Sequence, residues 1–129
     1  MVARPLAVVA PWRWWVGFGV IVVIAAGMSF VSYVEGLPSV FGEGQNDKIL
    51  HFVLAGLLSF FLDGALARRS VPRLGTLAIP LAAVLVLVPV GLEEYLQRYA
   101  TLRTSSIWDF VADIGGVACF IPLSRRAAK

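Results

Sequence analysis

Charged side chains are scarce in this chain, and their scarcity defines its class. Only 15% of the 129 residues are Asp, Glu, Lys or Arg, whereas 59% are hydrophobic. Soluble domains have about 25% charged and about 45–50% apolar residues, so we expect an integral membrane protein. The formal charge of +3 does not indicate a nucleic-acid partner, because the basic residues cluster where a membrane topology needs them.

Cysteine is nearly absent as well. Cys119 is the only cysteine in the sequence, which excludes an intrachain disulfide and a metal site built from several thiolates. A single small, apolar side chain in a helix is expected to serve packing. The polar stretches between apolar runs are only about as long as connecting loops, so a second, soluble domain is excluded too.

The longest segment without charge lies near the N-terminus. Residues 14–34 contain no charged side chain, and at 1.5 Å per residue a helix of this length reaches about 31 Å, enough to cross a hydrocarbon core of ~30 Å. Arg4 and Arg13, followed by an apolar run that ends in small residues at 25–27, also fit a cleavable signal peptide. The run is longer than the usual ~7–15 residues, so we expect it to remain as a membrane span.

Three more helices are expected after the first. Asn46 can cap the second, and Thr104, Ser105 and Ser106 offer a cap for the last. The third contains Pro80 and Pro89, each of which removes one backbone hydrogen bond and can kink the helix. The four helices are expected at about 14–34, 47–68, 74–98 and 107–123. The sequence therefore predicts one all-α domain over residues 1–129, an integral membrane bundle of four transmembrane helices.

The basic residues predict the orientation of this bundle. One side holds Arg4, Arg13, Arg68, Arg69, Arg73, Arg125, Arg126 and Lys129, and the other holds Lys48, Arg98 and Arg103. By the positive-inside rule, we expect both termini in the cytoplasm. Aromatic residues are expected to mark the two interfaces, with Trp12, Trp14 and Trp15 on the inner side and Tyr33, Tyr95, Tyr99 and Trp108 on the outer side.

Polar residues at the outer ends of the last three helices form the candidate site. Asp47 and His51 are four residues apart and share one helix face, so the carboxylate can orient the imidazole. The alternative is that Asp47 serves the helix N-terminus and His51 hydrogen-bonds within the bundle. Asp113 lies seven residues beyond Ser106, about 10 Å into the helix, where no cap explains it. A carboxyl group at that depth must be protonated, paired with Arg103, Lys48 or His51, or exposed to a wet cavity.

Three other polar residues have an ordinary structural alternative. Glu94 and Gln97 share a helix face, but Glu94 also has the spacing of an ion pair with Arg98. Asp109 stands three residues after Ser106, the spacing of a capping box. The face that carries Asp113 continues to Gly116, which should let another helix approach closely. Near the opposite end of the bundle, Asp63 is expected to pair with nearby arginines and lies outside the site.

The polar residues form two motifs, Asp47-Lys48-x-x-His51-Phe52 and Glu94-x-x-Gln97-x5-Arg103-x5-Asp109-x3-Asp113-x2-Gly116. In order and spacing they resemble the VanZ-like membrane proteins, named after a teicoplanin-resistance determinant, over roughly residues 45–120. The family usually has Asn where this chain has Asp113, a change that adds a proton or charge. It often has Gly where this chain has Phe120, which weakens the case for close helix contact at that position. The resemblance implies a small multi-span envelope protein, integral to the bacterial cytoplasmic membrane and linked to reduced glycopeptide susceptibility, without an established reaction.

A binding function is the first hypothesis for the site. Lys48 and Arg103 would hold an anionic lipid headgroup or the phosphate of a lipid-linked envelope precursor. Gln97 and Asp109 would orient these cations and bind sugar hydroxyls. Membrane lipids and such a precursor are then the expected partners, and an oligomer is compatible with this function.

Catalysis within the membrane is the second hypothesis. His51 would act as general acid or base, with Asp47 orienting it and Glu94 or Asp113 as a second acid. Arg103 would stabilise the phosphate of a lipid-linked substrate.

Two further alternatives are left open. A divalent metal could be bound by Asp47, His51, Glu94 and Asp109, and their hard carboxylate ligands suit Mg²⁺ or Mn²⁺. No compact metal motif is present, however, and we expect no cofactor. Proton-coupled transport would use the intramembrane acids as a relay. It would need an oligomer, because the chain has only four short helices and the first has no ionisable group between Arg13 and Glu35.

Overall fold

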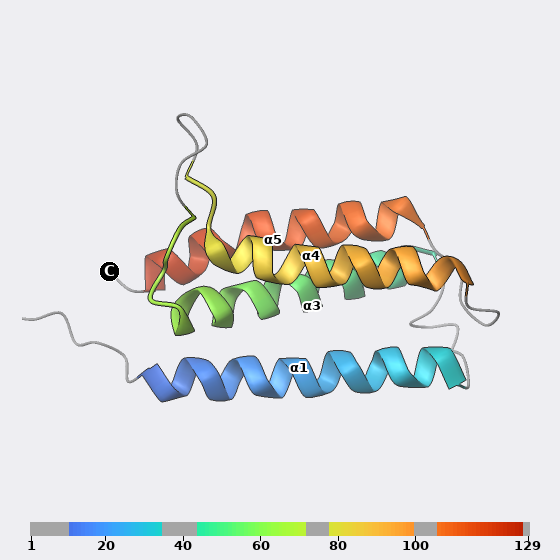
Figure 1. Cartoon of the computed structure of the whole chain (residues 1–129), viewed down its shortest axis with the longest axis horizontal. Helices are drawn as coiled ribbons and strands as arrows, with labels where there is room; N and C mark the ends of the chain where they lie inside the picture. The colour runs from blue at the N-terminus through green and yellow to red at the C-terminus, as the bar shows by residue number, and fades with distance from the viewer. Residues whose placement is uncertain (1–10, 35–43, 72–77, 100–105, 128–129) are drawn as a thin grey trace, which may run out of the picture.

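The computed structural model describes residues 11–34, 44–71, 78–99 and 106–127, most of which belong to four long helices (Figure 1). The elements are α1 (Pro11–Val34), α3 (Gly44–Ala65), α4 (Leu81–Leu96), the 3₁₀ turn η1 (Gln97–Tyr99) and α5 (Ile107–Ala127). No strand occurs among the described residues, so the predicted all-α class is confirmed.

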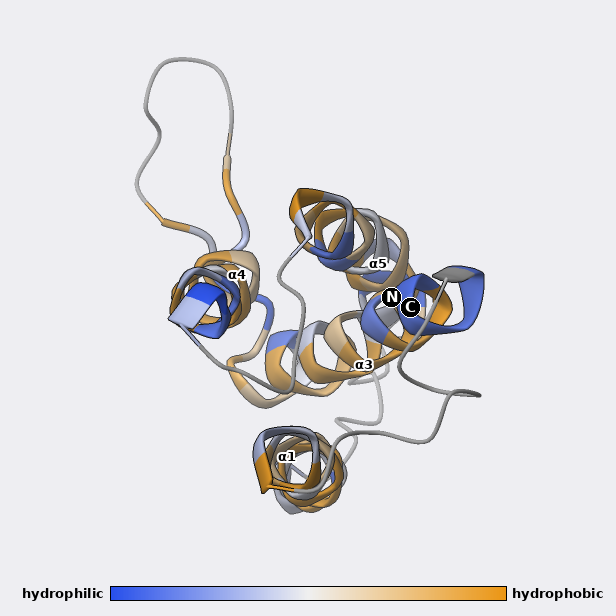
Figure 2. Cartoon of the chain, turned by 90° about the vertical axis from the view of Figure 1, so that its right-hand side faces the viewer, coloured by the Kyte–Doolittle hydropathy of each residue, from blue (hydrophilic) through white to orange (hydrophobic). Residues whose placement is uncertain are grey.

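Helix α3 lies at the centre of the bundle. Seen along the bundle, α1 and α5 lie on opposite sides of α3, and α4 packs beside both α3 and α5 (Figure 2). The buried apolar core comes from the three helices α3, α4 and α5, through Ala55, Leu62, Ala82, Val86, Val117 and Ile121. Because α3 contacts every other helix, its side chains can take part in sites on several faces.

Three helices are long and apolar enough to cross a membrane: Pro11–Val34, Gln45–Ala65 and Ile107–Ala127. Large apolar side chains such as Val23, Phe30 and Ile114 are exposed on them. A helix that exposes apolar residues on its outward face suits hydrocarbon better than water. Helix α4 has 16 residues and is not one of the three.

The second predicted helix is displaced by three residues at each end. Helix α3 begins at Gly44, so Asn46 lies inside its first turn and does not cap it. It ends at Ala65 and not at Arg68, because Ala67 and Arg68 adopt left-handed backbone conformations with φ of 52° and 58°. The Ala67 and Arg68 amides donate to the Gly64 and Asp63 carbonyls at 3.1 and 2.8 Å. This is the hydrogen-bond pattern of a Schellman cap, here formed without glycine at the left-handed position.

The prediction that Pro80 lies inside the third helix was wrong. Pro80 precedes Leu81, the first residue of α4, where its lack of an N–H group costs no helix hydrogen bond. The segments before and after 72–77 pair with each other, since the Val71 amide donates to Ile79 O and the Leu81 amide to Arg69 O, both at 2.9 Å. The expected start at 74 falls outside the described residues. Pro89 does lie inside α4, as predicted.

Trp14, which we expect at the inner interface, is buried between α1 and α3. Its side chain is 8% exposed and packs against Phe60 and Phe61. Gly64 makes room for the ring, because a Cβ at this position would lie 2.1 Å from it. Trp14 therefore fixes α1 on α3.

Helices α3 and α5 run in the same direction and approach each other closely (Figure 1). A Cβ on Gly116 would lie 2.0 Å from the backbone oxygen of Phe52, so only glycine fits there. This confirms the close approach predicted at Gly116. Gly56 of α3 makes room for Phe120 of α5, because a Cβ on Gly56 would lie 2.5 Å from the Phe120 ring. The Phe120 departure from the VanZ-like pattern is thus accommodated by a glycine on the opposite helix.

Two polar contacts keep α3 and α5 in one register. His51 contacts Asp113, and Asp63 contacts Arg125; in both pairs the partners are 62 residues apart in the chain. Asp63 is fully buried and accepts two hydrogen bonds from the Arg125 guanidinium, at 3.3 and 3.2 Å. The predicted pairing of Asp63 with an arginine is confirmed.

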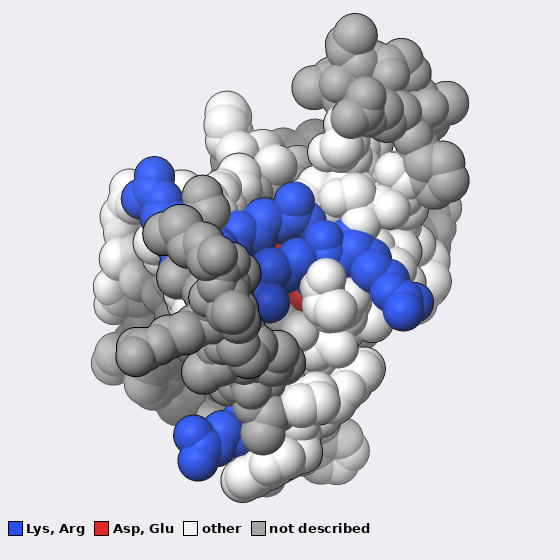
Figure 3. All heavy atoms as spheres, turned by 90° about the vertical axis from the view of Figure 1, so that its left-hand side faces the viewer, with Lys and Arg blue, Asp and Glu red and all other residues white. Residues whose placement is uncertain are grey.

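The end of the bundle around this ion pair is strongly basic. Lys and Arg side chains gather on it (Figure 3), where α1 begins, α3 ends and α5 ends. The described basic residues at this end are Arg13, Arg68, Arg69, Arg125 and Arg126. Lys48 and Arg98 belong to the opposite end.

We expect Gly116→Ala to destabilise the protein, because the added methyl group must push the backbones of α3 and α5 apart. Overpacking of this kind costs about 1–3 kcal/mol. The measurement is the unfolding transition of the purified protein in detergent. Gly19→Ala is the matched control, because a Cβ at Gly19 has no described atom within 4 Å. Equal stability of the two variants would show that the helices are not in contact at Gly116.

Candidate functional site

His51 lies between two carboxylates at the end of the bundle where α3 and α5 begin. Its Nδ1 is 3.1 Å from Asp113 Oδ1 and 3.3 Å from Oδ2. Its Nε2 is 3.8 Å from Asp47 Oδ1, one helical turn earlier on α3. Sequence reasoning had assigned the orienting role to Asp47, whereas the shorter contact belongs to Asp113. A carboxylate acceptor at this distance fixes the plane of the imidazole ring.

Asp113 has the partner that its depth required. Asp113 is 2% exposed. Of the three partners considered from the sequence, His51 contacts it in the described structure. Arg103 was another of those candidates and lies outside the described residues. Lys48, the third, reaches a different carboxylate: its Nζ is 3.8 Å from Asp109 Oδ1.

Glu94 replaces Asp109 in the predicted capping box. Ser106 does cap α5, since the Trp108 amide donates to Ser106 Oγ at 3.3 Å. The reciprocal bond, which a capping box would give to Asp109, goes to another helix: the Ser106 amide donates to Glu94 Oε1 at 2.8 Å. Asp109 is 3% exposed, and its Oδ1 accepts no hydrogen bond from the described residues. The capping role of Asp109 was therefore wrong, and its carboxylate faces Lys48 and the α3 residues.

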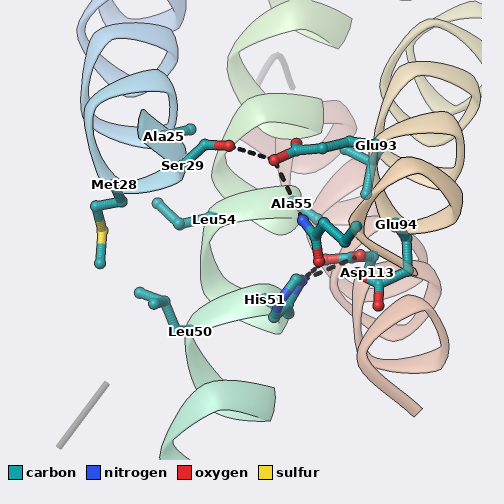
Figure 4. A pocket seen from close by; sticks show the side chains of 12 residues that line it. Ala25, Met28, Ser29, Leu50, His51, Leu54, Ala55, Glu93, Glu94 and Asp113 are labelled. Atoms are coloured by element: carbon teal, nitrogen blue, oxygen red, sulfur yellow. Dashed lines mark hydrogen bonds and ion pairs between the residues drawn. The ribbon is translucent and has the colours of Figure 1, made fainter. Parts of the chain in front are cut away.

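A cavity of about 80 Å³ opens beside His51, between α1, α3 and α4 (Figure 4). This volume holds several water molecules. Apolar side chains of α1 and α3 form one wall, and polar side chains of α3, α4 and α5 form the other (Figure 4). The apolar wall includes Ala25, Met28, Leu50 and Leu54, and the polar wall includes His51, Glu93, Glu94, Gln97 and Asp113. Such a cavity matches a molecule with an apolar and a polar part.

Gln97 lines this cavity, as part of a network that the sequence did not reveal. Gln97 is 1% exposed; its Nε2 donates to Glu93 Oε1 at 3.3 Å, and its Oε1 accepts no hydrogen bond from the described residues. Ser29 Oγ of α1 also donates to Glu93 Oε1 (Figure 4). The sequence analysis did not predict a role for Glu93 or Ser29. Two signals were present: Ser29 interrupts an otherwise apolar helix, and of two adjacent acids, Glu93 and Glu94, at least one is expected to face inward.

Three of the predicted residues have metal-ligating atoms close together. One ligand atom from each of Asp47, His51 and Asp109 lies within 4.8 Å of the other two. Glu94, the fourth residue of the metal variant, is not part of this group within the described ranges. The described site thus joins carboxylates, an oriented imidazole and a buried amide, a set that can accept hydrogen bonds, transfer protons or bind a cation.

We expect Glu94→Ala to weaken the N-terminus of α5, because the Ser106 amide loses its acceptor. The loss of a capping bond costs about 1 kcal/mol. Amide hydrogen exchange at Ser106 should accelerate, and Glu94→Gln should largely restore protection. Glu93→Ala is the control, because Glu93 contacts Ser29 and Gln97. The capping role fails if the Ser106 amide exchanges equally fast in wild type and Glu94→Ala.

Comparison of the chain with protein-family models, with curated proteins and with solved structures found no match. The resemblance to VanZ-like proteins therefore rests on the two sequence motifs alone.

Proposed function

We propose that this chain is a VanZ-like protein of the bacterial cytoplasmic membrane that binds the polar head of a membrane amphiphile. The two motifs support the family, and the three apolar helices support the membrane location. A fourth span is formed by α4 together with η1. Their 16 and 3 residues, with rises of about 1.5 and 2.0 Å, give a length of about 30 Å, which matches the hydrocarbon core.

The proposed orientation places the basic end in the cytoplasm, together with both termini. Arg13, Arg68, Arg69, Arg125 and Arg126 support it within the described residues, and Arg4, Arg73 and Lys129 add to it in the sequence. The candidate site then lies toward the outer leaflet, where lipid-linked envelope precursors are used.

A fluorescent protein fused after Lys129 should therefore be fluorescent, and alkaline phosphatase fused there should be inactive. A second fusion, made to a chain that ends at residue 100, should give the opposite pattern, because an odd number of spans precedes it. The measurement is reporter activity normalised to the amount of fusion protein. An active phosphatase after Lys129 would reverse the orientation and move the site to the inner face.

The buried acceptor on Gln97 is the observation that carries the ligand proposal. Gln97 lines a cavity with one apolar and one polar wall, and its buried Oε1 accepts no hydrogen bond from the described residues. A buried carbonyl without a donor costs about 1–3 kcal/mol, so a bound hydroxyl, amine or water stabilises it. The neighbouring carboxylates are acceptors as well. We infer that the ligand donates several hydrogen bonds, as the hydroxyls of a sugar do.

A phosphate on the same ligand needs positive charge. The described lining of the cavity has no lysine or arginine. Lys48, which contacts Asp109 and whose side chain is 37% exposed, lies near the site and is a candidate to bind the phosphate. Arg103 is a second candidate, outside the described residues. A lipid-linked sugar phosphate of the cell envelope combines all three features: an apolar chain, hydroxyls and a phosphate. Binding such a precursor would connect the protein to glycopeptide susceptibility.

We expect Gln97→Leu to weaken binding of a glycosylated polyprenyl phosphate by about 5- to 150-fold, the equivalent of one unmade buried hydrogen bond. Binding is measured by native mass spectrometry of the protein in detergent, with unglycosylated polyprenyl phosphate as the second probe. Leu92→Ala, on the exposed face of α4, should leave both affinities unchanged. Equal loss for the two probes, or no loss, would contradict sugar recognition by Gln97.

Acid-base catalysis is the second candidate function, and the His51–Asp113 hydrogen bond favours it. An imidazole oriented by a buried carboxylate beside a cavity can take or give a proton. In this candidate Asp113 orients His51, while Glu94 also serves α5 and is less suited to proton transfer. His51→Ala would then abolish turnover of the bound precursor while leaving its affinity within a few-fold of the wild-type value.

A further inference from the structure

Asp47, His51 and Asp109 enclose a small space between the first turns of α3 and α5. Asp47 and Asp109 lie in the first turns of their helices, and His51 lies one turn after Asp47. One nitrogen or carboxylate oxygen from each residue lies within 4.8 Å of the others. The closest measured pair is His51 Nε2 and Asp47 Oδ1, at 3.8 Å, which is too long for a hydrogen bond.

Asp113 fixes the imidazole in the orientation that a metal ligand needs. His51 Nδ1 lies 3.1 Å from Asp113 Oδ1; an ionised Asp113 can only accept, and Nδ1 is then the donor. The opposite nitrogen, Nε2, then faces Asp47. A histidine that ligates a metal through one nitrogen and donates to a carboxylate through the other is the usual arrangement in metalloproteins.

Asp109 supplies an independent sign that a cation is expected. It is 3% exposed, and its Oδ1 accepts no hydrogen bond from the described residues. Glu94 has taken the Ser106 amide that the spacing would have given to Asp109. Lys48 Nζ approaches this oxygen only to 3.8 Å, from a side chain that is 37% exposed and can move away. A buried carboxylate oxygen of Asp109 thus lacks a hydrogen-bond donor among the described residues, and this carboxylate has an oxygen within 4.8 Å of ligand atoms of Asp47 and His51.

A cation would offset the charge of the carboxylates around this space. When ionised, Asp47, Asp109 and Asp113 add three negative charges, and the described positive groups in contact with them are Lys48 and, when protonated, His51. In a medium of low dielectric constant, such an excess is unfavourable unless it is neutralised. A divalent ion would offset two of these charges.

We propose that Asp47, His51 and Asp109 bind a divalent transition-metal ion, Mn²⁺ or Zn²⁺, and that Asp113 positions His51 for this role. One imidazole and two carboxylates combine the donor types that these two ions accept, whereas Mg²⁺ and Ca²⁺ prefer oxygen alone. Metal–ligand bonds of about 2.0–2.2 Å place neighbouring ligand atoms roughly 3–3.5 Å apart. Binding would therefore draw the ligand atoms, now within 4.8 Å of one another, closer together through side-chain rotation. The metal proposal does not depend on the identity of the amphiphile.

The test uses the full chain, purified in detergent, stripped of metal with a chelator and titrated with MnCl₂. Free Mn²⁺ is measured by electron paramagnetic resonance, and ZnCl₂ is added as competitor. We expect one equivalent to bind and zinc to displace it. We expect Mn²⁺ affinity to fall at least about tenfold in each of the ligand variants His51→Ala, Asp47→Asn and Asp109→Asn. Asp113→Ala should lower it by about 10- to 100-fold, and the affinity of Asp113→Asn should lie between those of the wild type and Asp113→Ala.

Two controls separate a metal site from general acidity or misfolding. Glu93→Gln removes a carboxylate of the adjacent cavity that is outside the cluster, so Mn²⁺ affinity should stay at the wild-type value. Lys48→Gln removes the competing cation, so the affinity should be unchanged or higher. If Lys48 and Asp109 formed only a structural ion pair, Lys48→Gln would instead bind Mn²⁺ no more tightly than Asp109→Asn.

A spectroscopic signal identifies the ligand directly. Electron spin echo modulation from a bound ¹⁴N nucleus should appear with Mn²⁺ in the wild type and vanish in His51→Ala at saturating Mn²⁺. The proposal is overturned if no equivalent of Mn²⁺ binds, if the nitrogen signal is absent, or if Glu93→Gln weakens binding as much as Asp109→Asn. None of these readouts uses the amphiphile, so failure of the ligand proposal and failure of the metal site remain distinguishable.

Discussion

The contact between Gly116 and the backbone oxygen of Phe52 sets the distance between α3 and α5, and the polar centre depends on that distance. His51 directly precedes Phe52, and Asp113 lies three residues before Gly116, so the hydrogen bond between them is about one turn from the contact. A spacing wider by even one methyl group would lengthen it beyond useful range. Side chains that are costly in an apolar environment thus stay paired because two backbones touch.

The buried acids differ in what satisfies them. Asp63 pairs with Arg125, Asp113 accepts from His51, and Glu94 accepts from the Ser106 amide of another helix. Polar groups that are remote from water must find partners inside the protein, and these contacts join α3, α4 and α5 into one network. Glu94 has an effect beyond its own bond, because by capping α5 it leaves the Asp109 carboxylate available to its neighbours across the helix interface.

The sequence predicted the helices and the buried polar positions, but not how the helices meet. Apolar length alone located α1, and depth along a helix marked Asp113 as needing a partner. Spacing within one helix says which residues share a face, yet it does not say which helix that face meets, so Glu94 capping α5 and Trp14 packing on Gly64 were not foreseen. The end of α3 was missed because Ala67, and not glycine, adopts the left-handed conformation. The expected contribution of Arg103 falls outside the described residues.

The shared register of α3 and α5 has a consequence for how this chain can vary. His51 and Asp63 are matched with Asp113 and Arg125 at one constant offset of 62 residues, with the glycine contacts between them. Inserting one residue in α3 between His51 and Asp63 would turn the rest of the helix by about 100° and shift it by about 1.5 Å, which breaks one of the two pairs. The two segments can therefore change length only together, so loops, and not these helices, are where insertions and deletions should accumulate among related sequences.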